Sequence, residues 1–218
     1  MTLSAVLFDR DGVLTHFDAA SAAADLQPLL PISLPALVMR WQAYGARHGF
    51  PADKVQEQRF FEGFWSSIGD ELGIDQSQRE RLRAFDYYRY IRAYPDAAPM
   101  LAQLKAAGFR IGVLSNFSLA SLDTSLARVG LGEWIDVAVS ATVIGAAKPA
   151  PAAYLAALDA LQVAPEACCF FDDELANVVG ARELGITGFL VERTRGEHDL
   201  ATGTIADLTG VWAAVHSL

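Results

Sequence analysis

Short apolar runs, separated by longer stretches with helical periodicity, dominate the hydrophobic pattern of this chain. Four of the runs are typical of buried strands, and they cover residues 5–8, 109–114, 135–139 and 167–171. Predominantly apolar character over so few residues indicates strands that are covered on both faces. Helical patterns separate the runs, so we expect parallel strands joined by right-handed connections. The pattern predicts an α/β fold with a Rossmann-like, doubly wound parallel sheet.

The interval between the first and second strands has a different pattern. Residues 17–93 contain no convincing strand, but they contain helical patterns at 34–48, 52–68 and 76–94. An interval of this length is too long for a loop in a compact fold. We therefore predict a small helical domain at 17–93, inserted into an α/β domain that consists of residues 1–16 and 94–218.

Polar side chains follow the predicted strands at the points where the apolar runs stop. In an open parallel sheet the carboxyl ends of the strands line one crevice, which is where ligands bind. We therefore expect these side chains to meet in one site. The expected site residues are Asp9, Asp11, Ser115, Asn116, Lys148, Asp172 and Asp173.

The two carboxylates after the first strand are the most informative of these residues. If the chain stays extended through Asp11, a period of two places Asp9 and Asp11 on one side and points Arg10 away from them. Each carboxylate then raises the other's cost of ionisation, which a hard divalent cation such as Mg²⁺ relieves. The alternative is a solvated strand-to-loop cap without chemistry.

The remaining candidates also have ordinary structural explanations. Ser115 and Asn116 are typical of a helix-capping turn, and a lysine before a proline, as at Lys148, is usually exposed. Their position at the ends of parallel strands favours a role in the site instead.

Four segments of the chain are similar to the four motifs of the haloacid dehalogenase-like (HAD) hydrolase superfamily, in the same order. They are FDRDGVL, VLSN, AAKP and FFDDELANVVGA, and together they span most of the chain outside residues 17–93. The two aspartates of the first segment resemble the phosphatase and phosphotransferase branch, because true dehalogenases keep the first aspartate and lack the second. The helical insertion resembles the C1 cap of this superfamily.

The resemblance implies roles in the reaction for the polar candidates of the first three segments. Asp9 is the expected nucleophile, and Asp11 is the expected acid and base, with its backbone carbonyl on the metal. Ser115, together with backbone amides at the start of the following helix, is expected to hold the transferring phosphoryl group. Asn116 is a weaker candidate for a contact with substrate or phosphate. Lys148 is expected to neutralise both the phosphate and Asp9.

The fourth segment implies the rest of a Mg²⁺ site. Alignment with the family's motif puts Asp173 on the usual ligand position and Asn177 where a second aspartate often stands. Asp172 is expected to orient water, Lys148 or the metal shell. The predicted metal group is therefore Asp9, Asp11, Asp172 and Asp173, and carboxylate oxygens are the ligands that Mg²⁺ prefers.

Composition narrows the class of partner. The chain has 218 residues, 52% of them hydrophobic, and a formal net charge of −9. An acidic chain has no electrostatic footprint for nucleic acid or for an anionic membrane, so we expect neither as a partner. No targeting segment or spanning apolar stretch is visible, which favours a cytoplasmic protein. The adjacent Cys168 and Cys169 fit neither a disulfide framework nor a metal motif.

The leading hypothesis is a Mg²⁺-dependent phosphatase that acts on a small phosphorylated metabolite, such as a sugar phosphate or a nucleotide-related compound, through an aspartyl-phosphate. The alternatives are a phosphomutase of the β-phosphoglucomutase type, a haloacid dehalogenase and a non-catalytic binding module. Oligomeric state is not indicated. Aromatic and cationic residues of 17–93 either enclose the substrate or pack helices together, and they include Trp41, Arg47, Phe61 and Arg89. His16 either faces the site or lies in solvent.

Overall fold

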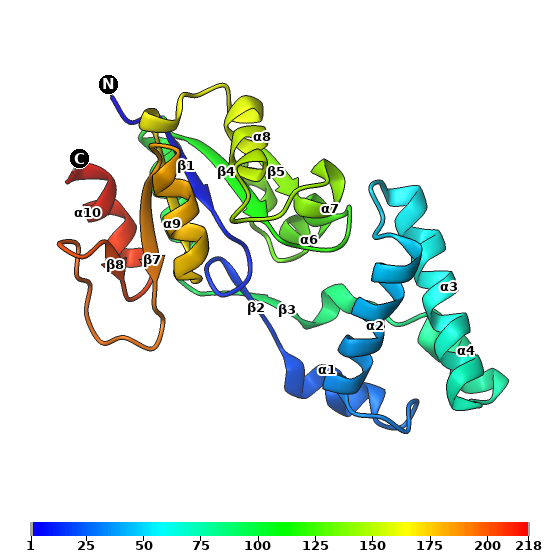
Figure 1. The fold of residues 1–218 in the computed structure, drawn as a ribbon. Helices are drawn as coiled ribbons and strands as arrows, with labels where there is room; N and C mark the ends of the chain where they lie inside the picture. Colours follow the sequence, from blue (N-terminus) through cyan, green and yellow to red (C-terminus); the bar gives the residue numbers. More distant parts are fainter. Residues whose placement is uncertain (1, 218) are drawn as a thin grey trace.

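Six parallel strands form the central sheet of the computed structural model, which describes residues 2–217 (Figure 1). The strand order is β5-β4-β1-β6-β7-β8, so β1 lies in the middle between β4 and β6. This order confirms the predicted doubly wound α/β fold. The strands are β1 Ala5–Phe8, β4 Arg110–Ser115, β5 Val137–Ser140, β6 Cys168–Asp172, β7 Thr187–Val191 and β8 Thr204–Ile205.

Helices cover both faces of the sheet, because alternate side chains of each buried strand are apolar on both sides. Val6 and Phe8 of β1 pack with α5 (Ala97–Ala106), α6 (Leu122–Arg128) and α10 (Val211–His216). Ala5 and Leu7 pack on the opposite face with α8 (Pro151–Leu161) and α9 (Leu175–Glu183). The short α7 (Ala141–Ile144) follows β5. We call this part the α/β unit.

Four helices form a second unit, which comprises residues 18–90 and is called the helical unit below. The helices are α1 Ala19–Leu26, α2 Leu34–His48, α3 Lys54–Leu72 and α4 Gln76–Arg83. Side chains cap their N-termini: Asp53 accepts from the amide of Gln56 at 2.8 Å, and Asp75 and Gln78 form a capping box. The helices share a separate hydrophobic cluster that includes Leu37, Phe64 and Leu82.

An antiparallel ribbon of two short strands connects the units (Figure 1). It pairs β2 (Thr15–Phe17) with β3 (Ile91–Ala93). Our expectation of no strand in 17–93 and of one helix over 76–94 was therefore wrong. The helix ends at Arg83, and Asp86 then caps a short 3₁₀ turn at Tyr87–Tyr90 before the chain pairs with β2. Pairing with a distant strand overrides local propensity here.

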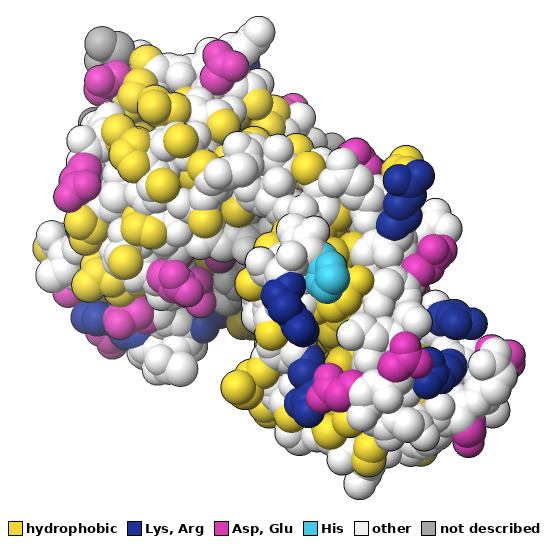
Figure 2. Space-filling view, turned by 45° about the vertical axis from the view of Figure 1, so that its right-hand side comes forward, with side chains coloured by type: hydrophobic (Ala, Val, Ile, Leu, Met, Phe, Trp, Pro, Cys, Tyr) yellow, Lys and Arg dark blue, Asp and Glu magenta, His cyan; other side chains and the backbone are white. Residues whose placement is uncertain are grey.

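The two units also touch along a second line, away from the ribbon. Figure 2 shows them as a larger lobe at upper left and a smaller lobe at lower right, with a hollow between them where hydrophobic side chains come to the surface. Thr142 of the α/β unit donates to the backbone oxygen of Pro51 at 2.8 Å, and Lys54 pairs with Asp123 at 2.7 Å. None of the helices within residues 2–217 is both long and apolar enough to cross a membrane.

Candidate active site

The carboxyl ends of β1, β4 and β6 bring the predicted site residues together. Phe8 lies opposite Val113 on one side and Phe171 on the other, and the amide of Asp9 donates to the oxygen of Phe171 at 2.8 Å. Asp9 and Asp172 therefore leave adjacent strands at the same level. Both are buried, with exposed fractions of 8% and 0%. Burial of two carboxylates side by side requires a cation nearby.

Lys148 supplies that cation. Its Nζ atom donates to Asp9 Oδ1 at 2.6 Å and to Asp172 Oδ2 at 2.7 Å, and the residue is 4% exposed. The loop that carries Lys148 is fixed by Asn116, whose carboxamide accepts from the lysine amide at 2.7 Å and donates to the lysine carbonyl at 2.9 Å. The alternative of an exposed lysine is thereby excluded, and the Asn116 side chain is engaged with the backbone of Lys148.

The protonation of Asp9 reflects this crowded environment. Burial raises the pKa of Asp9 to about 7; Lys148 acts against this rise, and Asp172 adds to it. Burial and a like charge make the ionised carboxylate less favourable, whereas the opposite charge of the lysine makes it more favourable. An added cation would lower this pKa and favour the ionised form.

Three carboxylates form a group that can hold a metal ion. Oxygen atoms of Asp9, Asp172 and Asp173 lie within 4.8 Å of one another. Burial, and then the charge of Asp172, raise the pKa of Asp173. Gly12 allows the approach of Asp173, since a Cβ atom at position 12 would lie 2.0 Å from Asp173 Oδ2. The donor set of hard oxygens and the excess of negative charge fit Mg²⁺.

Asn177 is a further feature of this group. Its Nδ2 atom donates to both oxygens of Asp172, at 3.1 and 3.2 Å, while its Oδ1 atom is buried and has no partner within residues 2–217. A buried acceptor without a donor is unusual in a native structure. Water held on a cation in the group would supply such a donor.

Asp11 is separated from this group and is bound by Arg10 instead. The Asp11 carboxylate pairs with the guanidinium of Arg10 and accepts from Thr15 at 3.1 Å. Our expectation that Arg10 points away from both aspartates was wrong, because pairing in β1 ends at Phe8 and the chain turns after it. The side chain of Asp11 therefore belongs to the cavity but lies outside the acidic group of Asp9, Asp172 and Asp173.

Arg10 itself is almost fully buried. It is 1% exposed, donates to Ser125 at 3.1 Å and lies 3.9 Å from the centre of the Phe117 ring. Such a fixed guanidinium holds Asp11 in one position beside the cavity. The sequence signal for this arrangement was the arginine between two aspartates. We placed its side chain on the wrong side because we extended the strand periodicity past Phe8.

Ser115 is also buried and lines the same cavity. The helix that we expected to begin beside it does not, since residues 116–121 form a loop before α6 starts at Leu122. The amide of Ser121, next to that helix start, donates to Glu57 of the helical unit at 2.9 Å. The amide of Ser121 is therefore engaged with the helical unit.

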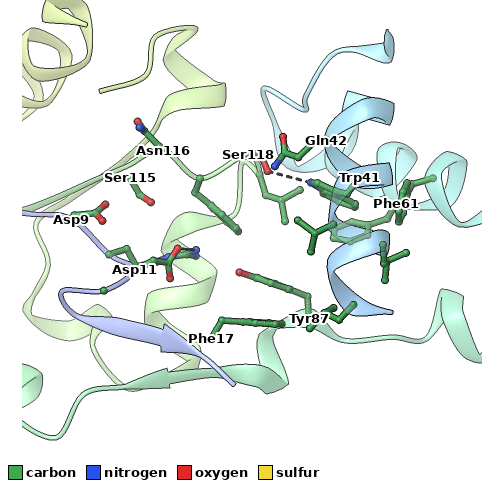
Figure 3. A pocket seen from close by; sticks show the side chains of 18 of the residues that line it. Asp9, Asp11, Phe17, Trp41, Gln42, Phe61, Tyr87, Ser115, Asn116 and Ser118 are labelled. Atoms are coloured by element: carbon green, nitrogen blue, oxygen red, sulfur yellow. Dashed lines mark hydrogen bonds and ion pairs between the residues drawn. The ribbon is translucent and has the colours of Figure 1, made fainter. Parts of the chain in front are cut away.

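A cavity of about 530 Å³ lies between the two units, and the carboxylates form one end of it (Figure 3). Asp9, Asp11, Ser115, Asn116, Lys148 and Asp173 line that end. At the other end, Trp41 and Phe61 of the helical unit face the site across the space, and Tyr87 and Phe17 lie along one side. This volume and shape are typical of a small-molecule site.

Several residues around the cavity escaped the sequence analysis. Gln42 and Phe117 line it without belonging to a motif. Glu57 could have been found, because it lies on the apolar stripe of α3 and is 7% exposed. His16, by contrast, is exposed and lies against the ring of Tyr94, and it does not line the cavity.

The family model for haloacid dehalogenase-like hydrolases matches residues 3–185 of the chain. The match includes all four motif segments and the helical unit. The protein therefore belongs to the haloacid dehalogenase-like hydrolases and is an enzyme of that family.

Relatives of two kinds are similar to the chain. Phosphatase MT3486 of Mycobacterium tuberculosis is 39% identical, over 98% of this chain and 97% of its own length. (S)-2-haloacid dehalogenase 4A of Burkholderia cepacia is 27% identical, over 88% of this chain and 84% of its own length. A crystal structure of 2-haloacid dehalogenase from Pseudomonas syringae pv. Tomato DC3000 has a TM-score of 0.72 at 19% identity, covering 99% of both chains, and supports the fold.

Proposed function

We propose that the protein is a Mg²⁺-dependent phosphatase that hydrolyses a small phosphate monoester through an aspartyl-phosphate on Asp9. The observation that carries the proposal is the buried Asp9 carboxylate beside the Lys148 ammonium, at the end of a cavity that a second carboxylate, Asp11, also lines. Similarity to a phosphatase over nearly the whole chain supports it.

In the first step, a carboxylate oxygen of Asp9 attacks phosphorus in line with the leaving oxygen. The bond from phosphorus to that oxygen breaks, the oxygen keeps the electron pair, and protonated Asp11 gives it a proton. Lys148 balances the negative charge of Asp9 and of the phosphoryl oxygens. The hydroxyl of Ser115 donates a hydrogen bond to a phosphoryl oxygen, and Asn116 keeps the lysine in position through the lysine backbone.

In the second step, Asp11 acts as a base. Its carboxylate takes a proton from water, the water oxygen bonds to phosphorus, and the bond from phosphorus to the Asp9 oxygen breaks. This step releases phosphate and restores Asp9. The contact with Arg10 holds Asp11 beside the cavity through both steps, as an ion pair when Asp11 is ionised and as a hydrogen bond to a carboxyl oxygen when Asp11 is protonated.

Asp9, Asp172, Asp173 and the backbone carbonyl of Asp11 would hold the Mg²⁺ ion. When bound, the ion neutralises carboxylate and phosphoryl charge. Asp172 has a second role, because it also accepts from Lys148 and from Asn177 and so fixes the lysine in the site.

We infer that the helical unit acts as a cap that encloses the substrate, and that the chain divides into this cap and an α/β core near residues 17 and 93. The unit supplies one wall of the cavity and has its own hydrophobic cluster. A cap that closes over the substrate excludes water while the aspartyl-phosphate forms.

The competing reactions lack a supporting observation in the site. A phosphomutase must bind a second hydroxyl of a sugar, and the cavity wall of α1–α4 offers one carboxamide for this, Gln42. Halide displacement needs a single nucleophilic carboxylate, and it leaves Asp11 and Asp173 without a role.

Release of inorganic phosphate tests the proposal. We expect turnover of 4-nitrophenyl phosphate and of primary alkyl phosphates with Mg²⁺, and loss of turnover when EDTA removes the ion. Chloride release from 2-chloropropionate is the rival measurement. Chloride release without phosphate release would replace the proposal with dehalogenation, and inactivity toward both classes would leave it without support.

The metal assignment has its own test. Asp173→Ala removes one of three carboxylates, so we expect weaker Mg²⁺ binding by calorimetry and a higher Mg²⁺ requirement for turnover. Glu183→Ala, an exposed change on the neighbouring α9, is the matched control. Unchanged Mg²⁺ affinity in Asp173→Ala would reject this ligand.

A further inference from the structure

The wall that the helical unit presents to the cavity is apolar. Its side chains include Leu26, Leu34, Leu37, Val38, Phe61 and Phe64. Gln42 carries the only carboxamide on this wall, and within residues 2–217 no charged side chain of α1–α4 lines the cavity. The aromatic side chains of Trp41 and Phe64 pack the helices together and also line the cavity.

Several polar groups of the helical unit near the cavity are bound elsewhere. The indole N–H of Trp41 donates to Ser118 at 3.3 Å, so this ring offers the cavity its carbon surface (Figure 3). Arg40 pairs with Glu71 at 2.8 Å, and Arg47 donates to the oxygen of Ala43 at 3.2 Å. The cations of α2 are therefore turned away from the space that the substrate would occupy.

We propose that the natural substrate is a phosphate monoester of an apolar alcohol, in which an alkyl or aryl-alkyl body lies against the helical unit and the phosphate lies at Asp9 and Lys148. The phosphate part of this inference rests on the proposed function above. The apolar part rests on the cavity wall alone. It replaces the sugar phosphate or nucleotide that we expected from the sequence.

The reason is the hydrogen-bonding demand of the alternatives. A sugar or a nucleoside brings several hydroxyl and ring nitrogen groups into the cavity, and each one that finds no partner loses its hydration without compensation. Besides the bound indole of Trp41, the helical unit within residues 2–217 offers these groups only the side chains of Gln42, Trp65 and Tyr87, and those three cannot satisfy them all. An apolar body makes no such demand, and its transfer from water to an apolar wall is favourable.

The position of Val38 indicates where a long substrate would leave the cavity. Val38 lines the space and is also 49% exposed, so the cavity opens to solvent beside it. Met39, the next residue of α2, is 73% exposed and does not line the cavity. The two neighbours therefore provide a test position and a matched control on one helix.

The first experiment compares primary phosphates whose leaving oxygens are chemically alike. We measure kcat/KM with Mg²⁺ for ethyl, butyl, hexyl and octyl phosphate, for 2-phenylethyl phosphate, and for glucose 6-phosphate and adenosine 5′-phosphate. We expect kcat/KM to rise by up to about four-fold for each buried CH₂ until the chain fills the cavity. The sugar and nucleotide phosphates should fall below hexyl and 2-phenylethyl phosphate. Equal or greater kcat/KM for either would overturn the inference.

The second experiment changes the wall. Val38→Asp places a carboxylate at the opening, so we expect the ratio of kcat/KM for octyl to ethyl phosphate to fall at least about five-fold. Met39→Asp adds the same charge one residue away and should keep the wild-type ratio. An unchanged ratio in Val38→Asp, or the same fall in both variants, would contradict the proposed path. Thermal melting checks that both variants are folded.

A binding measurement separates this inference from the proposed function. We titrate hexyl phosphate and glucose 6-phosphate into the Asp9→Asn protein with Mg²⁺, where no turnover is expected, and expect tighter binding of hexyl phosphate. If wild-type protein releases phosphate but shows no preference for apolar bodies, the inference fails and the function stands. If hexyl phosphate binds more tightly but no ester is hydrolysed, the apolar site stands and the function fails.

Discussion

The two ends of the cavity are built in opposite ways. At the α/β end, Asp9, Lys148 and Asp172 are buried and joined by hydrogen bonds of 2.6 and 2.7 Å, and Asn116 fixes the loop of the lysine. At the helical end, most of the side chains are apolar, Gln42 being an exception, and the indole N–H of Trp41 is bound to Ser118. Ion pairs and directional hydrogen bonds determine the structure of the α/β end, whereas the shape and the area of an apolar surface determine that of the helical end.

This difference assigns separate tasks to the two ends. Hydrogen bonds and ion pairs at strand ends hold reacting groups within a narrow range of positions, which phosphoryl transfer requires. An apolar wall is less directional and can admit bodies of different shapes. Changes at the α/β end should therefore alter the rate for every substrate, whereas changes at the helical end should alter the ranking of substrates.

The largest expected effect tests the charged end. Asp9→Asn keeps the size of the side chain but removes the nucleophile, so we expect phosphate release to fall by at least about 10⁴-fold for every ester. Circular dichroism should show an unchanged fold. Substantial turnover in the purified variant would mean that another group attacks phosphorus.

The second effect depends on the leaving group. Asp11→Asn cannot protonate the leaving oxygen, so we expect a loss of about 10²–10⁴-fold with alkyl phosphates. The loss should be much smaller in the first step with 4-nitrophenyl phosphate, whose leaving group needs little protonation. A pre-steady-state burst of nitrophenol measures that step. Equal losses of the burst rate for both classes would argue against an acid role.

The third effect concerns stability as well as rate. Lys148→Met leaves Asp9 and Asp172 buried without their cation, so we expect a loss of about 3–5 kcal/mol in the free energy of unfolding without metal. Because Lys148 lowers the pKa of Asp9, its removal raises that pKa further. The acidic limb of residual activity should therefore move to higher pH.

The matched control for this variant is Lys105→Met. Lys105 pairs with Asp136 at 2.7 Å near the surface, and its side chain is 34% exposed. Exposed pairs contribute about 0–1 kcal/mol, so the control should unfold almost like the wild type in denaturant. Similar losses in both variants would remove the distinction between buried and exposed pairs.

The smallest effect tests how the two ends are held together. Glu57 of the helical unit accepts from the amide of Ser121 at 2.9 Å and from its hydroxyl at 2.5 Å, and from Tyr88 at 3.1 Å. Glu57→Gln weakens these charge-assisted bonds, so we expect a loss of about 1–2 kcal/mol. Faster hydrogen exchange at residues 118–121 should accompany it. Glu62→Gln, exposed on the same helix, should change neither measurement.

The elements with strong local signals could be predicted from the sequence. Helix 34–48 has the predicted bounds, because Ser33 caps its start and Gly49 ends it with a positive φ of 82°. The β1 strand also has its predicted bounds. The strand β3 at Ile91–Ala93 was missed, since its extended form depends on pairing with Thr15–Phe17, more than seventy residues earlier.

The site could be predicted in part for a similar reason. The ends of parallel strands meet whatever the loops do, so the sequence could indicate that Asp9, Lys148 and Asp172 come together. Arg10 was misplaced because strand periodicity stops where pairing stops. The apolar wall could not be read from composition, because residues 17–93 contain both Arg47, on α2, and Phe61, on α3, and only packing decides which of them faces the cavity.

The loop at residues 116–121 has a consequence for how the enzyme would respond to its own product. Its first residue fixes Lys148, while Ser118 and Ser121 bind Trp41 and Glu57 of the helical unit. One short segment therefore contacts both the lysine at the proposed phosphate site and the helical unit. If phosphate binds more tightly in one arrangement of the two units, thermodynamic reciprocity requires bound phosphate to favour that arrangement by the same factor. The affinity for phosphate and the equilibrium between arrangements of the two units would then be linked, so that a measurement of one predicts the change in the other.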